Sequence, residues 1–90
     1  MGLLRDDPAA GRLEMTVDDH VVFADYRRAG GALIIDHVEA PPPLRGTGAA
    51  GLFMQALAAH ARTAGDTIVP ICGYAAAWLK RHHEHADLLG

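Results

Sequence analysis

The segment from Arg45 to Ala50 reads Arg-Gly-Thr-Gly-Ala-Ala and stands just before a run of helix-forming residues. Glycine carries no side chain, so the backbone there can approach a ligand closely. The first turn of a helix leaves several N–H groups unpaired and carries a partial positive charge. Together these features make an anion site, usually for phosphate or pyrophosphate. Arg45 would add a charged donor to such a site.

Two common phosphate loops fit this segment poorly. A Walker loop ends in Gly-Lys followed by Ser or Thr, which this segment lacks. A dinucleotide fingerprint needs a third glycine at another spacing, an acidic residue about 20 positions further on and a βαβ unit that starts the fold. The spacing does match a third pattern, Arg/Gln-x-x-Gly-x-Gly/Ala. The ordinary alternative is a helix start in which small residues allow tight packing.

Polar side chains appear in the second half of a strand expected over Ala32 to Ala40. Its apolar run Leu33 to Ile35 is typical of a strand covered on both faces. The polar second half indicates where the strand leaves the core and enters a site. Because side chains alternate along a strand, His37 and Glu39 are expected to share a face with Leu33 and Ile35.

Cys72 is the single cysteine of the chain, so it cannot form an internal disulfide, which fits a reducing compartment. Three interpretations stay open: a buried small residue, a reactive thiol or a metal ligand. The nearby His82, His83 and His85 lack the paired spacing of structural zinc sites. Adjacent helical residues also point about 100° apart. We therefore expect no metal site.

Strands and helices in a β-β-β-loop-α-β-α order are expected to position these groups. Residues 1–11 are polar and broken by Pro8 and Gly11, so we expect a flexible tail there. Alternation predicts strands, and apolar residues at helical spacing predict helices. The expected elements are strands over 12–17, 21–28, 32–40 and 67–71 and helices over 48–64 and 74–82. Residues 12–90 then form a single domain of the α+β or α/β class.

Composition excludes several classes of protein. The chain has 90 residues, which makes one domain, and its 50% apolar content excludes intrinsic disorder. No apolar run approaches the ~20 residues of a membrane span, and the N-terminus has no signal-peptide core. We therefore expect a cytoplasmic protein without a membrane partner. The net charge of −3 argues against nucleic acid, whose binding needs a basic stripe.

Taken jointly, three blocks resemble the GNAT superfamily of acyl-CoA-dependent N-acetyltransferases, and in particular the small YjdJ-type N-acetyltransferase domains. The Arg/Gln-x-x-Gly-x-Gly/Ala pattern is the pyrophosphate-binding signature of that superfamily. The similarity covers Arg12 to Leu89, and its blocks are 36–50, 61–74 and 78–88. The resemblance implies a minimal GNAT-like α+β fold, with a mixed, mostly antiparallel sheet, splayed strands and helices packed on the sheet.

The resemblance implies acetyl-CoA as the cosubstrate and no metal. Its pyrophosphate would lie on backbone amides of the loop, from the residues Arg45, Gly46, Thr47, Gly48, Ala49 and Ala50. Its pantetheine arm would run along Val38 to Ala40, between two strands that splay apart. Pro70 suits a strand that stops pairing there because it lacks an N–H, although it can equally be an edge-strand proline. Arg81 would reach a phosphate of CoA, or else lie on a solvated face.

The resemblance also implies transfer of acetyl to an unidentified amine. An amine must lose a proton to attack, and Glu39 is the first candidate base, with His37 second. Tyr74 is the candidate proton donor to the departing thiolate. Cys72 matches a cysteine of this small family, and a helix N-terminus would make it nucleophilic enough to accept acetyl transiently. Each of these residues also has an ordinary alternative. Glu39 would be a solvated carboxylate and His37 a hydrogen-bonded, half-buried side chain. Tyr74 would be a packed aromatic and Cys72 a small packing residue.

Two departures from the family pattern affect the wall of the site. Gly73 stands where these domains often have proline, and 81–85 reads Arg-His-His-Glu-His in place of Arg-His-Pro-Glu-Tyr. The N-terminal helices that wall the acceptor site in larger members have no counterpart here. The acceptor, a small-molecule or protein-borne amine, would enter an open groove of a monomer or a groove completed in a homodimer. The rival function is a non-catalytic CoA- or acyl-CoA-binding module that acts as a sensor or interaction domain.

Overall fold

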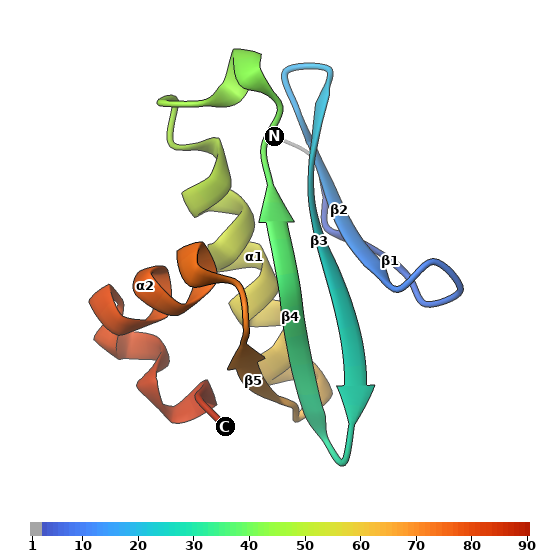
Figure 1. The fold of residues 1–90 in the computed structure, drawn as a ribbon, viewed down its shortest axis with the longest axis vertical. Coiled ribbons are helices and arrows are strands. Elements are labelled where there is room, and N and C mark those ends of the chain that lie inside the picture. The colour runs from blue at the N-terminus through green and yellow to red at the C-terminus, as the bar shows by residue number, and fades with distance from the viewer. Residues whose placement is uncertain (1–2) are drawn as a thin grey trace.

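A five-stranded sheet with helices packed against it forms the fold of the computed structural model, which describes residues 3–90 (Figure 1). The strands are β1 (Arg5–Asp7), β2 (Arg12–Val17), β3 (His20–Ala29), β4 (Ala32–Glu39) and β5 (Thr67–Pro70). The helices are α1 (Ala49–Ala64) and α2 (Gly73–Arg81), with short 3₁₀ helices η1 (Pro42–Leu44) and η2 (His83–Leu88). The expected α+β class with a mixed sheet is confirmed.

The strands follow one another across the sheet in the order β1-β2-β3-β4-β5. The first four pair antiparallel, whereas β5 pairs parallel to β4 after the crossover through α1. Tight turns connect β2 to β3 and β3 to β4. Asp18 and Asp19 both have positive φ, as do Gly30 and Gly31, which matches the turn geometry that suits twisted antiparallel strands.

One face of the sheet holds the hydrophobic core. Alternate residues of β2, β3 and β4 point toward α1, and Leu13, Val22 and Leu33 are among those that are fully buried. From α1, Phe53 and Leu57 fill the space opposite them. This burial of apolar side chains is the main stabilising contribution to a domain of this size. Within residues 3–90, no helix has the length and apolar character needed to cross a bilayer.

The other face of the sheet, which we call the open face, carries residues that are half-buried or exposed. It includes Arg12, Glu14, Phe23, Asp25, Ile34 and Glu39. Figure 1 shows β4 in front of α1 when the sheet is seen from this side. The expected cover on both faces of β4 is therefore wrong, because α1 packs on one face and leaves Ile34 half-buried on the other.

The segment that we expected to be a tail contains the additional strand β1. Backbone pairing joins Arg5–Asp7 to β2, and the Tyr26 hydroxyl donates a hydrogen bond to Asp6 at 2.5 Å. The amide of Tyr26 also donates to the Gly11 carbonyl at 2.8 Å. A polar strand of three residues has no hydrophobic period to reveal it, so the expected element order lacks it. The mobility of residues 1–11 stays a prediction.

A β-bulge changes the direction of the side chains along β4. Asp25 lies opposite His37, whereas Tyr26 lies opposite Ile35, so Asp36 is an extra residue on β4. Ile35 is buried on the core face, and His37 is exposed on the open face. The expectation that these two residues share a face is therefore wrong. Strict alternation holds only where no residue is inserted.

The core can be tested with the same substitution at two positions of α1. Leu57 is fully buried, whereas the Leu52 side chain lies at the surface with 46% of the residue exposed. Leu57→Ala should lower the free energy of unfolding by about 2–5 kcal/mol, because it removes buried methyl groups and leaves a cavity. Leu52→Ala should lower it by less than about 1 kcal/mol. Urea denaturation measures both values, and equal losses would contradict the assigned packing.

Candidate functional site

The edge strand β5 parts from β4 halfway along β4. Their parallel pairing ends at Ile35 opposite Pro70, while β4 continues to pair with β3 as far as Glu39. The carbonyl oxygen of Ile35 accepts both the Ile71 amide at 2.9 Å and the Cys72 amide at 3.0 Å, and the chain then turns into α2. Beyond Ile35, β4 therefore keeps a strand partner on the β3 side alone.

The loop between β4 and α1 uses three of its amides internally. The Arg45 amide donates to the Pro42 carbonyl at 3.1 Å, and the Thr47 amide donates to the Leu44 carbonyl at 3.2 Å. The Ala49 amide donates to the Thr47 hydroxyl oxygen at 3.3 Å. These three bonds define the path of the loop, so half of the six amides that we expected to bind an anion are already paired.

The remaining amides at the start of α1 are available to a ligand. Gly46 and Gly48 adopt left-handed backbone conformations with φ of 79° and 85°, which glycine adopts without strain. Within the described part of the chain, no acceptor meets the amides of Gly46, Gly48, Ala50 and Gly51. The first turn of α1 also lacks an acidic side chain. The arrangement is suited to an anion. Gly51 is not among the residues expected from the sequence to bind an anion, although its place in the first helical turn was a signal for its unpaired amide.

A pocket of about 310 Å³ opens where the end of β4 meets the starts of α1 and α2. Its lining residues are His37, Val38, Glu39, Ala40, Arg45, Ala50 and Tyr74. The structure thus brings together seven of the candidate site residues. The Arg45 guanidinium donates to the Ala40 carbonyl at 3.2 Å, which holds this cation at the wall of the pocket.

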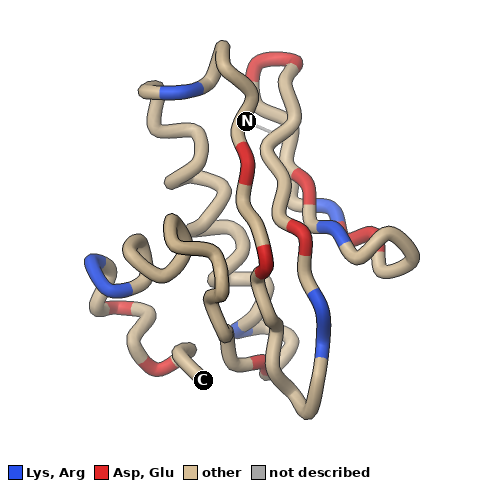
Figure 2. The backbone as a smooth tube through the Cα atoms, in the orientation of Figure 1, with Lys and Arg blue, Asp and Glu red and all other residues tan. Residues whose placement is uncertain are grey.

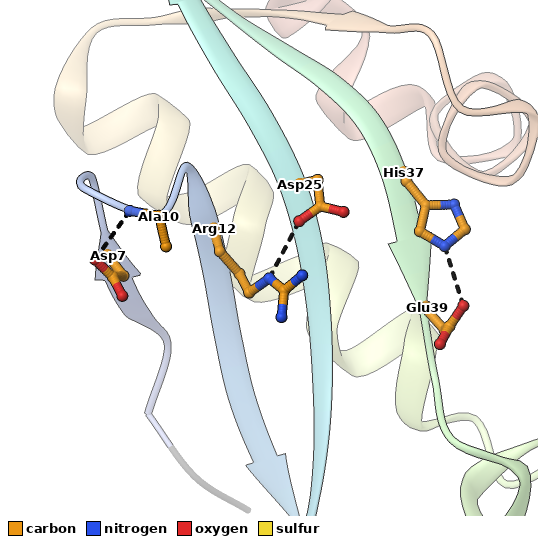
Figure 3. Close-up of polar contacts among 6 residues, drawn as sticks. All are labelled: Asp7, Ala10, Arg12, Asp25, His37 and Glu39. Carbon is orange, nitrogen blue, oxygen red and sulfur yellow. Dashed lines mark hydrogen bonds and ion pairs between the residues drawn. The ribbon is translucent and has the colours of Figure 1, made fainter.

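The side chains of His37 and Glu39 are in contact at the mouth of the pocket. The His37 Nε2 atom lies 3.1 Å from Glu39 Oε1, and the two side chains are 52% and 49% exposed. Both project from β4 on the open face, on which Arg12 and Asp25 also lie (Figure 3). A carboxylate beside an imidazole can take a proton from a substrate and pass it on to solvent.

Tyr74 contributes a phenol to the opposite wall. It is the second residue of α2 and is partly exposed. Burial raises the pKa of Tyr74 above its usual value of 10.0, the positive charge of Arg81 lowers this pKa, and Cys72 raises it. The net shift is upward, so the hydroxyl is protonated at neutral pH and can donate a proton or a hydrogen bond.

Other candidate residues lie outside the lining of the pocket. Cys72 occupies the N-cap position of α2 without a side-chain hydrogen bond to the helix, is half-buried and packs against the core. Arg81 is exposed at the last turn of α2, close enough to act on Tyr74. The loop residues Gly46, Thr47 and Gly48 lead into α1 and Ala49 is its first residue, and none of the four lines the pocket.

The histidines near the C-terminus pack on an aromatic ring. The His82 ring stacks on Trp78 with centroids 3.7 Å apart and planes 12° apart, and the His85 ring lies 5.8 Å from the same indole. His85 Nε2 also lies 2.9 Å from the Gln55 amide oxygen. Among residues 3–90, no group of three or more His, Cys, Asp or Glu side chains is arranged to hold a metal ion.

The comparisons with known proteins agree with this geometry. A family model described as GCN5-related N-acetyl-transferase matches residues 12–88. The chain belongs to the GCN5-related N-acetyltransferase family. The resemblance to the GNAT superfamily is thereby confirmed, while membership of the YjdJ-type subgroup stays a prediction. No curated protein matches the chain significantly.

A solved structure shows the same fold. It is the NMR solution structure of a "GCN5-like putative N-acetyltransferase" from Staphylococcus aureus, with a TM-score of 0.75 and 20% identity. The match covers 97% of this chain and 86% of that one. At this identity the likeness concerns the fold alone, and it extends over nearly the whole of this GCN5-related chain.

The electrostatic coupling across α2 gives a direct test of the site. Arg81→Gln removes the cation that lowers the pKa of Tyr74, so this pKa should rise further. Lys80→Gln is the matched control, because Lys80 is not among the groups that shift Tyr74. Titration of ring-labelled tyrosine by NMR separates Tyr74 from Tyr26. Equal shifts of the pKa in the two variants would contradict the placement of Arg81.

Proposed function

We propose that this chain is an acetyl-CoA-dependent N-acetyltransferase, with residues 12–90 acting as one acyl-CoA-binding domain. One observation carries the proposal. The pocket at the parting of β4 and β5 lies directly beside four amides without an acceptor, at the start of α1. CoA combines an anionic pyrophosphate with a long uncharged arm. The pyrophosphate would bind at the amides and the arm would lie in the adjoining pocket.

The cofactor would use two parts of the backbone. Its pyrophosphate would accept hydrogen bonds from the amides of Gly46, Gly48, Ala50 and Gly51, assisted by the positive end of the α1 dipole. Its pantetheine amides would pair with the free edge of β4 beyond Ile35, as an added strand pairs with a sheet edge. Arg45 at the pocket wall would supply a charge close to the phosphates.

The chemistry supported best is direct attack by the amine. The amine nitrogen would form a bond to the thioester carbonyl carbon while the carbon–sulfur bond breaks. Glu39 would accept the proton of the amine, with His37 passing it to solvent, and Tyr74 would return a proton to the CoA sulfur. Direct attack is favoured over an acetyl-cysteine intermediate because Cys72 packs against the core and does not line the pocket.

Two substitutions separate an enzyme from a binding module. Glu39→Gln should lower kcat by about 100-fold, at the lower end of the range for a general base, because His37 remains. Cys72→Ala should change kcat by less than about threefold if the amine attacks directly. Release of the CoA thiol in the presence of an amine panel measures both rates.

Binding by the same variants provides the control. Acetyl-CoA at 100 times its dissociation constant should stabilise each protein by about 2.7 kcal/mol, which raises the unfolding midpoint by roughly 10–20 °C. Free CoA should act similarly and ATP should not. Normal binding with no turnover in the parent protein would support the non-catalytic sensor instead. A large loss of turnover in Cys72→Ala would overturn direct attack.

A further inference from the structure

Three apolar side chains lie beside the point where β5 leaves β4. Ile34 and Val69 are opposite each other on the two strands, on the open face of the sheet, and both are half-buried. Ile71 stands at the parting itself, because its amide donates to the Ile35 carbonyl, and it is 61% exposed. We call Ile34, Val69 and Ile71 the apolar patch. Contiguous apolar surface of this kind is typical of a ligand-binding groove.

The apolar patch adjoins the pocket. Tyr74, which lines the pocket, follows Ile71 by three residues and is itself 39% exposed. The segment from Thr67 to Leu79 contains no Lys, Arg, Asp or Glu. Figure 2 accordingly shows β5 and most of α2 without a charged position. The apolar surface is thus continuous in sequence with the wall of the pocket.

One charged pair borders the patch on β3 and β4. Arg27 lies opposite Ile34 and donates two hydrogen bonds of 2.8 Å to the Asp36 carboxylate. The two charges neutralise each other, so this border attracts neither a cation nor an anion. The patch therefore suits an uncharged, apolar ligand.

The packing of the core decides where the acyl group of the cofactor can extend. In the proposed function the arm of the cofactor runs along the free edge of β4, and its thioester lies at the parting. The core behind the parting is filled, since Ile35, Ile68 and Ala75 are fully buried. Acyl carbons beyond the carbonyl cannot turn in that direction without displacing these side chains. They have room on the open face, where the apolar patch begins.

We infer that the site takes a medium-chain acyl-CoA, with a hexanoyl or octanoyl chain lying on Ile34, Val69 and Ile71, in preference to acetyl-CoA. This inference rests on the proposed function. Two residues of extended chain, such as Val69 to Ile71, span about 7 Å, which a chain of this length can cover. An acetyl group has only a methyl beyond its carbonyl and leaves the patch uncovered.

The transfer step keeps the balance of the proposed function. The amine nitrogen bonds to the carbonyl carbon of the acyl group while the carbon–sulfur bond breaks. Glu39 takes the amine proton, and the CoA sulfur regains a proton from Tyr74.

Calorimetric titration with acetyl-, butyryl-, hexanoyl- and octanoyl-CoA tests the inference. Burial of one methylene group tightens binding about fourfold, and a chain on an open surface keeps part of this gain. The dissociation constant should therefore fall roughly tenfold from acetyl- to octanoyl-CoA. Ile71→Ser should remove most of this difference and leave the binding of acetyl-CoA unchanged, whereas Ile71→Leu should preserve the difference.

Val21→Ser is the matched control. Val21 is 38% exposed and precedes the buried Val22, so it lies on the open face. It is six residues from Arg27 along β3, which places it about 20 Å from the patch. This variant should keep the preference for octanoyl-CoA. The second measurement is kcat/KM with one amine, which should be at least as high for octanoyl-CoA as for acetyl-CoA.

The outcomes separate this inference from the proposed function. Tighter binding of octanoyl-CoA that depends on Ile71, together with octanoyl transfer, would support it. Equal or weaker binding of the longer chains, a preference that survives Ile71→Ser, or acetyl transfer without octanoyl transfer would overturn the medium-chain donor alone. A dimer in analytical ultracentrifugation that Ile71→Ser dissociates would show that a second copy covers the patch, and would also overturn it. Failure of both acetyl-CoA and CoA to bind would instead overturn the proposed function.

Discussion

The carbonyl oxygen of Ile35 accepts two amide protons, from Ile71 and Cys72, and at that point β5 leaves β4. Pro70 lies opposite Ile35 and has no N–H to continue the pairing. A bulge at Asp36 then turns the end of β4 so that His37 and Glu39 point away from the core. The free strand edge, the pocket and the exposed polar pair all follow from this local geometry.

The helix α1 contributes both to the hydrophobic core and to the candidate site. The buried side of α1 fills the core with Phe53 and Leu57, and its first turn presents unpaired amides beside the pocket. Small residues at its start leave the backbone accessible, and left-handed glycines turn the loop toward it. Because α1 covers one face of the sheet, the exposed side chains of His37 and Glu39 at the site lie on the other face.

The sequence predicts the regular elements well and the local irregularities poorly. Alternating residues in β2 and helical spacing in α1 identified both elements, and Gly65 marked the end of α1. An inserted residue such as Asp36 leaves no sign in the alternation, so the face of His37 was misassigned. β1 depends on backbone pairing and on the bond between Tyr26 and Asp6, which lie far apart in the sequence.

Amide NMR of the labelled protein during titration with acetyl-CoA tests the central claim, that the parting of β4 and β5 creates the cofactor site. The largest shifts are expected at Gly46, Gly48, Ala50 and Gly51 and along the free edge from His37 to Ala40. Amides of β1 and β2, at the far side of the sheet, should change little. Unchanged spectra at millimolar acetyl-CoA, or shifts centred on β1 and β2, would contradict it.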